Sequence, residues 1–358
     1  MTLIDTRTTE SFEQWHIQDA KNVPFNPSEW FDEGHESAVR SIANDDPVTV
    51  ICGKGLTSTP FGIQLDDRGF DEVSVVRGGM EAWCELYNIA RFAGDGAVIY
   101  QLQRRATGCL SYVIASEKTG VALIVDPTRQ RDVFTSLIAR ERLSVAAVID
   151  THLHADHLSG GPELADELGI PYRLGAHETA NHRYDSLEDG GEISLNGVLV
   201  TTHHAPGHTG EMANIVVNGT FVLSSDSLLL DSVGRTELGF GVDGAENGAK
   251  QLYETIHRFL LELNSDPTVL PGHISISNDL TYENGSPGQP IGRSLSTIAE
   301  SVDLIGTDRE SFIEKITTDL PQKPRNYERI VAINAGNEQV ELEAEAAALD
   351  SGANNCSA

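Results

Sequence analysis

Short apolar runs rich in β-branched residues recur along the chain, and longer segments of mixed polarity separate them. Two of the clearest runs cover residues 47–52 and 143–150, and each has the length of one buried strand. The segments between such runs place apolar residues at helical spacing, as in 245–263, where Leu252 and Ile256 share one face. Strands and helices that alternate in this way predict an α/β protein.

The first 90 residues form one α/β unit by this pattern. Strands are predicted at 3–5, 47–52 and 73–76, and helices at 9–15 and 59–68. The second of these helices begins with Thr59 and Pro60, a capping residue followed by a proline in the first turn. Residues 91–97 are predicted to be a linker.

A second, larger α/β domain is predicted over 98–336, and an acidic C-terminal tail over 337–358. The strands of this domain are predicted at 99–102, 109–115, 121–125, 143–150, 171–175, 197–202, 215–217, 221–223 and 268–270. Asn218 and Gly219 separate two of them and favour a tight hairpin turn. A chain of 358 residues is long enough for two such domains.

Charge excludes several classes of partner. The chain has 54 acidic and 25 basic residues, and its formal net charge is −29. Nucleic acid and anionic membranes are therefore not expected as partners, because their phosphates would be repelled. Since the acidic excess is spread along the whole chain, it is typical of a halophilic protein, whose carboxylates keep its surface hydrated in salt; an ordinary acidic protein is the alternative.

The cysteines and the N-terminus indicate a compartment. Cys52, Cys84, Cys109 and Cys356 have no close spacing, so a disulfide framework is not expected, and Cys84 and Cys109 are predicted to be core residues. No apolar run has the length of a membrane span. The first residues lack the basic start and apolar core of a signal peptide. These features predict a cytoplasmic protein.

One loop concentrates metal-binding side chains. His152, His154, Asp156 and His157 fall within six residues, directly after the predicted strand 143–150. Imidazole and carboxylate groups are ligands of divalent metal ions, and α/β sheets keep their sites at the carboxyl ends of strands. The loop is therefore predicted to bind metal.

Cys52 ends another predicted strand and faces a glycine-containing loop, 53–58. Backbone N–H groups and the N-terminus of the following helix would stabilise a thiolate at this position. Such a thiolate could take up a sulfane sulfur and hold it as a persulfide. An inert buried thiol is the alternative.

The N-terminal unit resembles a rhodanese domain. The resemblance is carried by Leu-Ile-Asp-Thr-Arg at 3–7, by the segment 16–24, by Cys52 and by Gly-Gly-Met-Glu-Ala-Trp at 78–83. It implies a sulfurtransferase in which Cys52 is the catalytic residue. The loop differs from the family pattern because it has no arginine and Lys54 is its only cation, which leaves the sulfur donor open.

The second domain resembles the metallo-β-lactamase superfamily. The resemblance rests on the histidine-rich loop and on His208, Asp226 and His273, each of which follows a predicted strand in the family's order. It implies an αββα sandwich. The segments 233–236 and 325–336 bring the domain nearest to the persulfide dioxygenase and glyoxalase II group, and within it nearer to the dioxygenases.

That resemblance implies two alternative metal sets. In a dioxygenase-like site, one Fe(II) per chain is held by His152, His208 and Asp226, with open positions for substrate. In that case four further side chains orient the ligands and exclude a second metal: His154, Asp156, His157 and His273. In a glyoxalase II-like site, two zinc ions bind. The first zinc would be held by His152, His154 and His208, the second by Asp156, His157 and His273, with Asp226 between them.

The resemblance also implies the substrates. If the second domain is a dioxygenase, its substrates are a low-molecular-weight thiol persulfide and O2, and its product is sulfite. A rhodanese-like domain that carries persulfide sulfur is chemically compatible with that reaction. The glyoxalase II reading gives hydrolysis of a thioester, and a third hypothesis is a non-catalytic persulfide carrier. Arg235 is a candidate for binding a substrate carboxylate, with an ion pair as the alternative. A homo-oligomer is left open.

Overall fold

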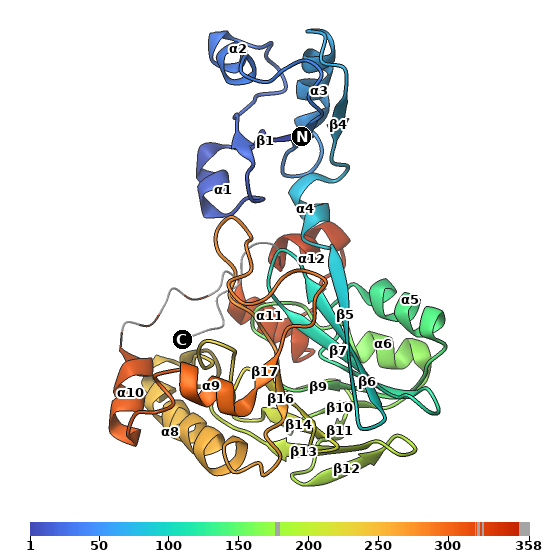
Figure 1. Ribbon diagram of the computed structural model, residues 1–358, viewed down its shortest axis with the longest axis vertical. Coiled ribbons are helices and arrows are strands. Elements are labelled where there is room, and N and C mark those ends of the chain that lie inside the picture. The colour runs from blue at the N-terminus through green and yellow to red at the C-terminus, as the bar shows by residue number, and fades with distance from the viewer. Residues whose placement is uncertain (176–179, 319, 321–322, 324–325, 351–358) are drawn as a thin grey trace.

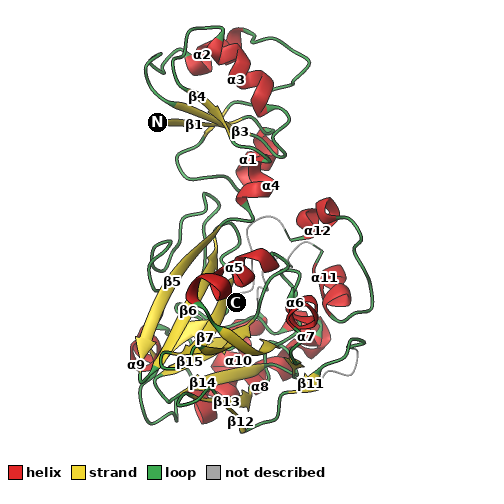
Figure 2. Ribbon diagram, turned by 90° about the vertical axis from the view of Figure 1, so that its right-hand side faces the viewer, coloured by secondary structure: helices red, strands yellow, loops and turns green. Residues whose placement is uncertain are grey.

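The computed structural model of the chain describes residues 1–358 except 176–179, 319, 321–322, 324–325 and 351–358. Two α/β units follow one another along the long axis of the molecule (Figure 1). The smaller unit contains the N-terminus, and the helix α4 (Gly79–Trp83) joins it to the larger one (Figure 2). Within the described ranges, no helix combines the length and the apolar character needed to cross a lipid bilayer.

The small unit is built on a parallel sheet with the strand order β2-β1-β3-β4. Its strands are β1 (Thr2–Asp5), β2 (Lys21–Asn22), β3 (Val48–Ile51) and β4 (Val73–Val75), and its other helices are α1 (Thr9–Gln14), α2 (Glu33–Val39) and α3 (Ser58–Asp66). Ile4, Val50, Phe61 and Leu65 are fully buried in its core. The strands predicted from the apolar runs in this unit are confirmed.

The large unit is a sandwich of two sheets with helices outside, so the predicted αββα architecture is confirmed. The first sheet has the order β11-β10-β9-β8-β7-β6-β5 and the second β12-β13-β14-β15-β16-β17. The first sheet contains β5 (Tyr87–Gly94), β6 (Ala97–Arg104), β7 (Leu110–Ser116), β8 (Val121–Val125), β9 (Ser144–Asp150), β10 (Tyr172–Leu174) and β11 (Asp185–Ser186). The second contains β12 (Gly191–Ser194), β13 (Leu199–His204), β14 (Ala213–Val217), β15 (Phe221–Ser225), β16 (Thr268–Pro271) and β17 (Arg293–Ser294).

Alternate side chains of the first sheet enter two different cores. In β7, Tyr112 and Ile114 face the second sheet, whereas Val113 and Ala115 face the helices α5 (Arg131–Glu141) and α6 (Gly161–Leu168). Because both faces of β7 and β8 are buried, these strands are nearly continuous apolar runs rather than alternating ones. This explains why they are easily recognised in the sequence.

The helices of the other outer layer pack with the second sheet. They are α7 (Glu237–Phe240), η1 (Val242–Gly244), α8 (Ala245–Thr255), the π-helical turn η2 (Ile256–Leu260), α9 (Leu295–Ser301) and α10 (Arg309–Thr317). Leu252, Ile298 and Phe312 bring α8, α9 and α10 into one core with the sheets. The helix predicted over 245–263 therefore forms, but its last part widens to a π-helical turn.

The predicted linker, 91–97, is not a linker. Most of it belongs to β5, which pairs with β6 along its whole length, from Tyr87 opposite Arg104 to Gly94 opposite Ala97. Asp95 and Gly96 have positive φ angles and make the tight turn between the two strands. The strand was missed because polar and small residues interrupt its apolar pattern.

The C-terminal segment is also part of the fold, up to Asp350. The helices α11 (Tyr327–Asn334) and α12 (Glu343–Leu349) pack together with Leu158, and Ala346 and Leu349 of α12 are buried. Asp350 is only 3% exposed and accepts hydrogen bonds from Arg104 at 3.1 and 3.2 Å. The predicted tail is therefore wrong for residues 343–350. Arg104 and Asp350 are 246 residues apart, so local sequence patterns could not predict that they form a buried ion pair.

The two units touch through the loop that follows β16. The backbone N–H of His16 donates to the carbonyl of Asn278 at 2.8 Å, and Leu280 packs with Cys84 and Trp15. Arg104 adds a second connection, since its Nε donates to the carbonyl of Cys84 at 2.8 Å. The small unit is thus attached to the part of the chain that directly follows His273.

Candidate metal centre and sulfur site

The ends of three strands and one loop bring the predicted metal ligands together. His152 follows β9, Asp226 follows β15 and His273 follows β16, while His208 lies in the loop between β13 and β14. Each strand is buried at the end where it enters the loop, so the loops start from rigid positions. Positions 152, 208, 226 and 273, which are distant in sequence, become neighbours at one edge of the sandwich.

Three of these residues form a compact group: His152, His208 and Asp226. Nε2 of His208 lies 3.5 Å from Oδ2 of Asp226, and Nε2 of His152 lies 3.8 Å from the same oxygen. All three side chains are at most 1% exposed. Neither Nε2 of His152 nor Oδ2 of Asp226 has a hydrogen-bond partner. Since a buried polar atom without a partner costs free energy, this arrangement fits a bound cation.

The two histidines are oriented through their other nitrogen atoms. Nδ1 of His208 donates to the carbonyl of Arg235 at 2.7 Å, which leaves Nε2 with its lone pair directed at the group. Nδ1 of His152 lies 3.0 Å from Oγ1 of Thr151 and 3.1 Å from Oγ of Ser225. Such contacts fix the tautomer and the ring orientation of metal-binding histidines.

The protonation states also suit metal binding. Burial, together with the nearby His154, holds the pKa of His152 well below its ordinary value. Burial alone would raise the pKa of Asp226, but the neighbouring His273, His208 and His152 outweigh it and lower this pKa far below the usual range. Near neutral pH His152 is therefore a neutral imidazole and Asp226 an ionised carboxylate, which are the forms that bind metal.

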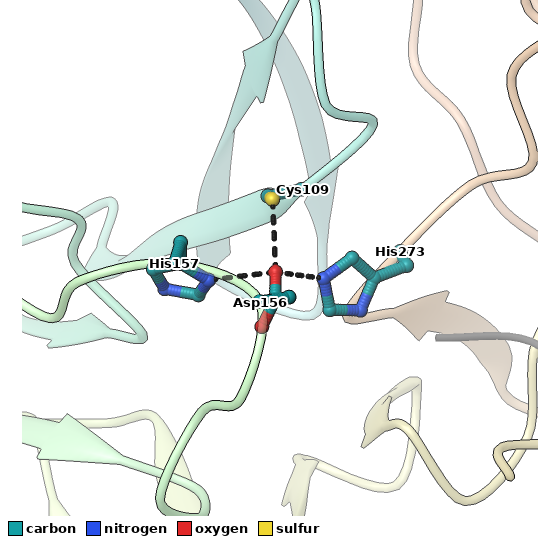
Figure 3. A group of neighbouring side chains, drawn as sticks. All are labelled: Cys109, Asp156, His157 and His273. Atoms are coloured by element: carbon teal, nitrogen blue, oxygen red, sulfur yellow. Dashed lines mark hydrogen bonds and ion pairs between the residues drawn. The ribbon is translucent and has the colours of Figure 1, made fainter. Parts of the chain in front are cut away.

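A second group lies beside the first and contains Cys109, Asp156, His157 and His273 (Figure 3). Oδ2 of Asp156 lies 2.9 Å from Nδ1 of His157 and 2.8 Å from Nε2 of His273, and accepts from Sγ of Cys109 at 3.2 Å. All four residues are buried. Burial raises the pKa of Cys109, but hydrogen bonds with His157 and His273 outweigh it and lower this pKa to about 7.

His273 connects the two groups. Its Nδ1 lies 2.7 Å from Oδ1 of Asp226, and its Nε2 faces Asp156. The two oxygens of Asp226 therefore have different neighbours: Oδ1 contacts His273, and Oδ2 faces His152 and His208. The side chain of His273 thus links Asp226 of the first group directly with Asp156 of the second.

His154 belongs to neither group. Its Nε2 lies 3.2 Å from Oδ1 of Asp126, and it forms a separate cluster with Asp126 and Asp150. Asp126 also accepts from the backbone N–H of Thr151 at 2.7 Å and from its hydroxyl at 2.9 Å. His154 and Asp126 thus hold the start of the loop in place.

Sequence reasoning missed three residues that shape the centre: Cys109, Asp126 and Asn334. Nδ2 of Asn334 donates to the carbonyls of His154 and His157, both at 2.8 Å, and its Oδ1 accepts from the backbone of Ser159 at 2.9 Å. Cys109 is buried, as predicted, but it lies among metal-binding side chains rather than in an apolar core. Nothing in its spacing signals this position, since its partner Asp156 is 47 residues away.

Arg235, the candidate for binding a substrate carboxylate, is fully buried in the structure. Its Nε donates to Oε1 of Glu237 at 2.6 Å, and its carbonyl accepts from His208. The guanidinium therefore forms an ion pair with Glu237 inside the protein. Arg235 contacts the metal centre through its backbone carbonyl, which accepts the hydrogen bond from His208.

Cys52 lies at the N-terminus of α3, as the sequence predicts. The backbone N–H of Gly55 donates to its Sγ at 3.1 Å, and Oγ of Ser58 lies 3.4 Å away. Burial raises the pKa of Cys52, but hydrogen bonds from Ser58 and Thr57 outweigh it and lower this pKa to about 7. In the same loop, Lys54 forms an ion pair with Glu81 at 2.9 Å. A substantial fraction of Cys52 is therefore ionised near neutral pH, although its side chain is buried, and the charge of Lys54 is balanced by Glu81.

Comparison with protein families agrees with this two-part architecture. Residues 1–86 match the rhodanese-like domain, and residues 104–273 match the metallo-beta-lactamase superfamily. Human persulfide dioxygenase ETHE1, a mitochondrial protein, is 28% identical over 195 residues, which are 52% of this chain and 72% of the human protein. An uncharacterized protein of Mycobacterium leprae is 31% identical over 193 residues, 46% of this chain and 86% of that protein.

Solved structures show the same fold. The crystal structure of ETHE1 from Myxococcus xanthus superposes with a TM-score of 0.57 at 25% identity and covers 67% of this chain and 99% of that one. A metallo-beta-lactamase from Staphylococcus aureus gives a TM-score of 0.60 at 21% identity, over 69% of this chain and 75% of that one. At this level of identity the second likeness concerns the fold alone.

Proposed function

Because the chain belongs to the metallo-beta-lactamase superfamily and carries a rhodanese-like domain at its N-terminal end, we propose that it is an iron-dependent persulfide dioxygenase. The substrates are a low-molecular-weight thiol persulfide and O2, and the products are sulfite and the free thiol. This assignment takes its substrate class from the similarity to ETHE1 proteins and its metal from the ligand set.

The group of His152, His208 and Asp226 is the observation that carries the proposal. Two histidines and one carboxylate on one side of a cation are typical of non-haem Fe(II) oxygenases, because they leave positions open for substrate and O2. Nε2 of His152 and Oδ2 of Asp226 lie 3.8 Å apart, and neither atom has a hydrogen-bond partner. This supports a single ion bound between them. We place one Fe(II) per chain there.

The surroundings support one catalytic ion better than two. A hydrolytic dizinc site would need His154 at the first ion and His273 at the second. In the structure His154 contacts Asp126, and the two nitrogens of His273 face two different carboxylates. These side chains orient Asp226 and the metal-binding loop, which is the role proposed for them.

The overall reaction balances with these groups. One persulfide, one O2 and one water give one thiol, one sulfite and two protons. The sulfane sulfur is oxidised by four electrons, O2 is reduced and supplies two of the three sulfite oxygens, and water supplies the third. A ferrous ion at this centre would supply the chemistry that lets the persulfide and O2 react. The protein's part is to bury the site, to hold Asp226 ionised and to keep His152 neutral.

Cys52 would exchange sulfane sulfur with the same class of thiol. Its thiolate attacks the outer sulfur of a persulfide, the S–S bond of the donor breaks, and the donor leaves as a thiolate while Cys52 becomes a persulfide. The reverse reaction would deliver a thiol persulfide to the metal centre. Such exchange needs reduced thiols, which suits a reducing compartment such as the cytoplasm.

The test is to load the purified protein with iron, supply a thiol persulfide, and follow O2 uptake and sulfite together. The proposal expects both, and no O2 uptake by iron-loaded protein would refute it. The Cys52→Ser variant should lose sulfur transfer and keep O2 uptake. Release of thiol from an acyl-thioester by zinc-loaded protein, without any dioxygenase activity, would instead establish the hydrolase.

A further inference from the structure

We propose that Arg105, Trp83 and Tyr282 bind a carboxylate of the thiol persulfide where the two units meet. The proposal rests on the function proposed above and deepens it, because it selects persulfides of thiols that carry a carboxylate. It also gives the small unit a part in binding the substrate, since Trp83 belongs to α4, which joins that unit to the large one. Arg235, which the sequence suggested for this role, is paired with Glu237 instead.

Tyr282 brings an unused hydroxyl group close to the metal groups. The residue lies in the loop after β16, pairs with Ile276 in an isolated β-bridge, and is only 7% exposed. Among the described residues, its hydroxyl oxygen has no hydrogen-bond partner. Burial raises the pKa of Tyr282 to about 12, the charge of Arg105 opposes this rise, and Cys109 adds to it, so both residues are near neighbours. The hydroxyl keeps its proton near neutral pH and can donate it to an anion.

Trp83 offers a second donor, from the small unit. Its Nε1 is buried and has no hydrogen-bond partner within the described part of the chain. The ring packs against a cluster that contains Leu280 of the loop after β16, and Figure 1 shows this loop, in orange, extending towards α1 and α4. A buried indole N–H usually has an acceptor, because an unpaired polar group costs free energy when it is buried. An acceptor from a ligand would satisfy it.

Arg105 supplies the positive charge. Its guanidinium carbon lies 5.6 Å from the centre of the Trp83 ring, and its Nη1 makes only a long contact, 3.4 Å, with Oδ1 of Asn88. In the described ranges, no carboxylate forms an ion pair with Arg105, whereas the neighbouring Arg104 is paired with Asp350. The side chain is partly exposed, so an anion can reach it from solvent. A carboxylate can accept hydrogen bonds from a guanidinium, a phenol and an indole together.

The place of these donors indicates that the anion is part of the substrate. The backbone N–H of Ile274 donates to the carbonyl of Gly108 at 3.0 Å, so the turn that carries Arg105 packs against the segment that follows His273. A persulfide whose sulfur lies at the metal can therefore direct its other end towards Arg105 and Tyr282. Since the chain has a net charge of −29, an anionic substrate needs such a local positive charge to bind.

The test compares two persulfides that differ only in the carboxylate, those of N-acetylcysteine and of N-acetylcysteine amide. The value of kcat/KM for O2 uptake by iron-loaded protein is measured with each, and the ratio of the two values is the readout. An inactive fraction of protein does not change this ratio. We expect the wild-type protein to prefer the carboxylate substrate about 10- to 100-fold, as one hydrogen bond to a charged group provides. A wild-type ratio near one would overturn the proposal.

Substitutions then locate the preference. Arg105→Gln should bring the ratio to about one by raising KM for the carboxylate substrate alone, and an unchanged ratio would refute the site. Tyr282→Phe and Trp83→Phe each remove one donor and keep the ring, and each should lower the ratio about 3- to 10-fold. Arg131→Gln is the matched control, because Arg131 is also partly buried but lies at the start of α5, and it should keep the wild-type ratio.

Binding without turnover separates this proposal from the dioxygenase function. The S-methyl derivatives of N-acetylcysteine and of its amide carry no persulfide, and calorimetry gives their dissociation constants for the wild-type and Arg105→Gln proteins. Tighter binding of the carboxylate form that depends on Arg105 supports the site even without O2 uptake, and then only the dioxygenase assignment fails. O2 uptake with equal use of both persulfides leaves the dioxygenase intact and refutes the carboxylate site.

Discussion

Replacing Ser58 by alanine should make the sulfur-carrying thiol of Cys52 less reactive near neutral pH. The thiolate of Cys52 is stabilised by the N–H of Gly55 and by the hydroxyl of Ser58, which lies 3.4 Å from Sγ. The substitution removes the hydroxyl and leaves the backbone contact in place. The reactive form of a cysteine is the thiolate, so a higher pKa lowers the rate at a given pH.

The size of the effect follows from this one contact. A hydrogen bond to a charged group contributes about 1.5–3 kcal/mol, and the length of this contact, 3.4 Å, places it at the low end. Since one pKa unit corresponds to about 1.4 kcal/mol, the pKa of Cys52 should rise from about 7 to roughly 8. At pH 7 the thiolate fraction then falls from about one half to about one tenth, which slows the reaction roughly fivefold.

The assay is the pH dependence of Cys52 alkylation by iodoacetamide, followed by mass spectrometry of the peptide that contains Cys52. Wild-type protein should show its inflection near pH 7 and the Ser58→Ala protein about one unit higher, with equal rates at high pH. Thr59→Ala is the control, because its exposed hydroxyl bonds to the carbonyl of Gly55 and not to sulfur. A wild-type inflection near 9, or equal inflections in both proteins, would refute the reasoning.

Three further substitutions test other contacts. Asp350→Ala leaves the buried guanidinium of Arg104 without its carboxylate and should lower the free energy of unfolding by about 3–5 kcal/mol, as measured by urea denaturation. Asn334→Ala removes the hydrogen bonds that hold the metal loop and should weaken iron binding about 10- to 100-fold, as measured by competition with a chelator. Glu81→Gln frees Lys54 and should raise kcat/KM for the dianion thiosulfate as sulfur donor by up to about fivefold, because exposed ion pairs contribute about 0.2–1 kcal/mol.

Each of these has a matched control. Glu343→Gln removes an exposed carboxylate next to Arg129 and should change the free energy of unfolding by less than about 1 kcal/mol. Asn284→Ala alters a buried asparagine outside the metal groups and should leave iron affinity unchanged. Glu246→Gln breaks a surface pair with Lys250 and should not affect thiosulfate use. If any control matches its test variant, the contact concerned does not have the role assigned to it.

Much of the fold was predictable from the sequence because strands such as β7 and β15 are buried on both faces. Val113 and Ile114 enter different cores, so β7 is apolar at every position and stands out from its surroundings. In β5, Arg91 and Gly94 interrupt that pattern, and the strand was mistaken for a linker. Asp350 looked like part of a solvated tail because its partner, Arg104, is visible only in three dimensions.

The sequence predicted which residue types form the metal centre, but it predicted less well which of these side chains lie together around one ion. His152 and Asp226 could be proposed because each follows a strand end, and the structure brings them together with His208. Which side chains share one ion depends on ring orientation, and spacing does not reveal that His154 turns to Asp126. The position of Cys109 depends on the pairing of distant segments, which local sequence patterns do not encode.

Oxygen uptake by protein loaded with one metal at a time tests the central claim most directly. Fe(II)-loaded and Zn(II)-loaded protein are each given a thiol persulfide in a closed oxygen-electrode cell, and sulfite is measured in the same samples. The account predicts that the iron-loaded protein consumes one O2 for each sulfite formed and that the zinc-loaded protein consumes none. Iron-loaded protein that leaves both O2 and persulfide unchanged would contradict it.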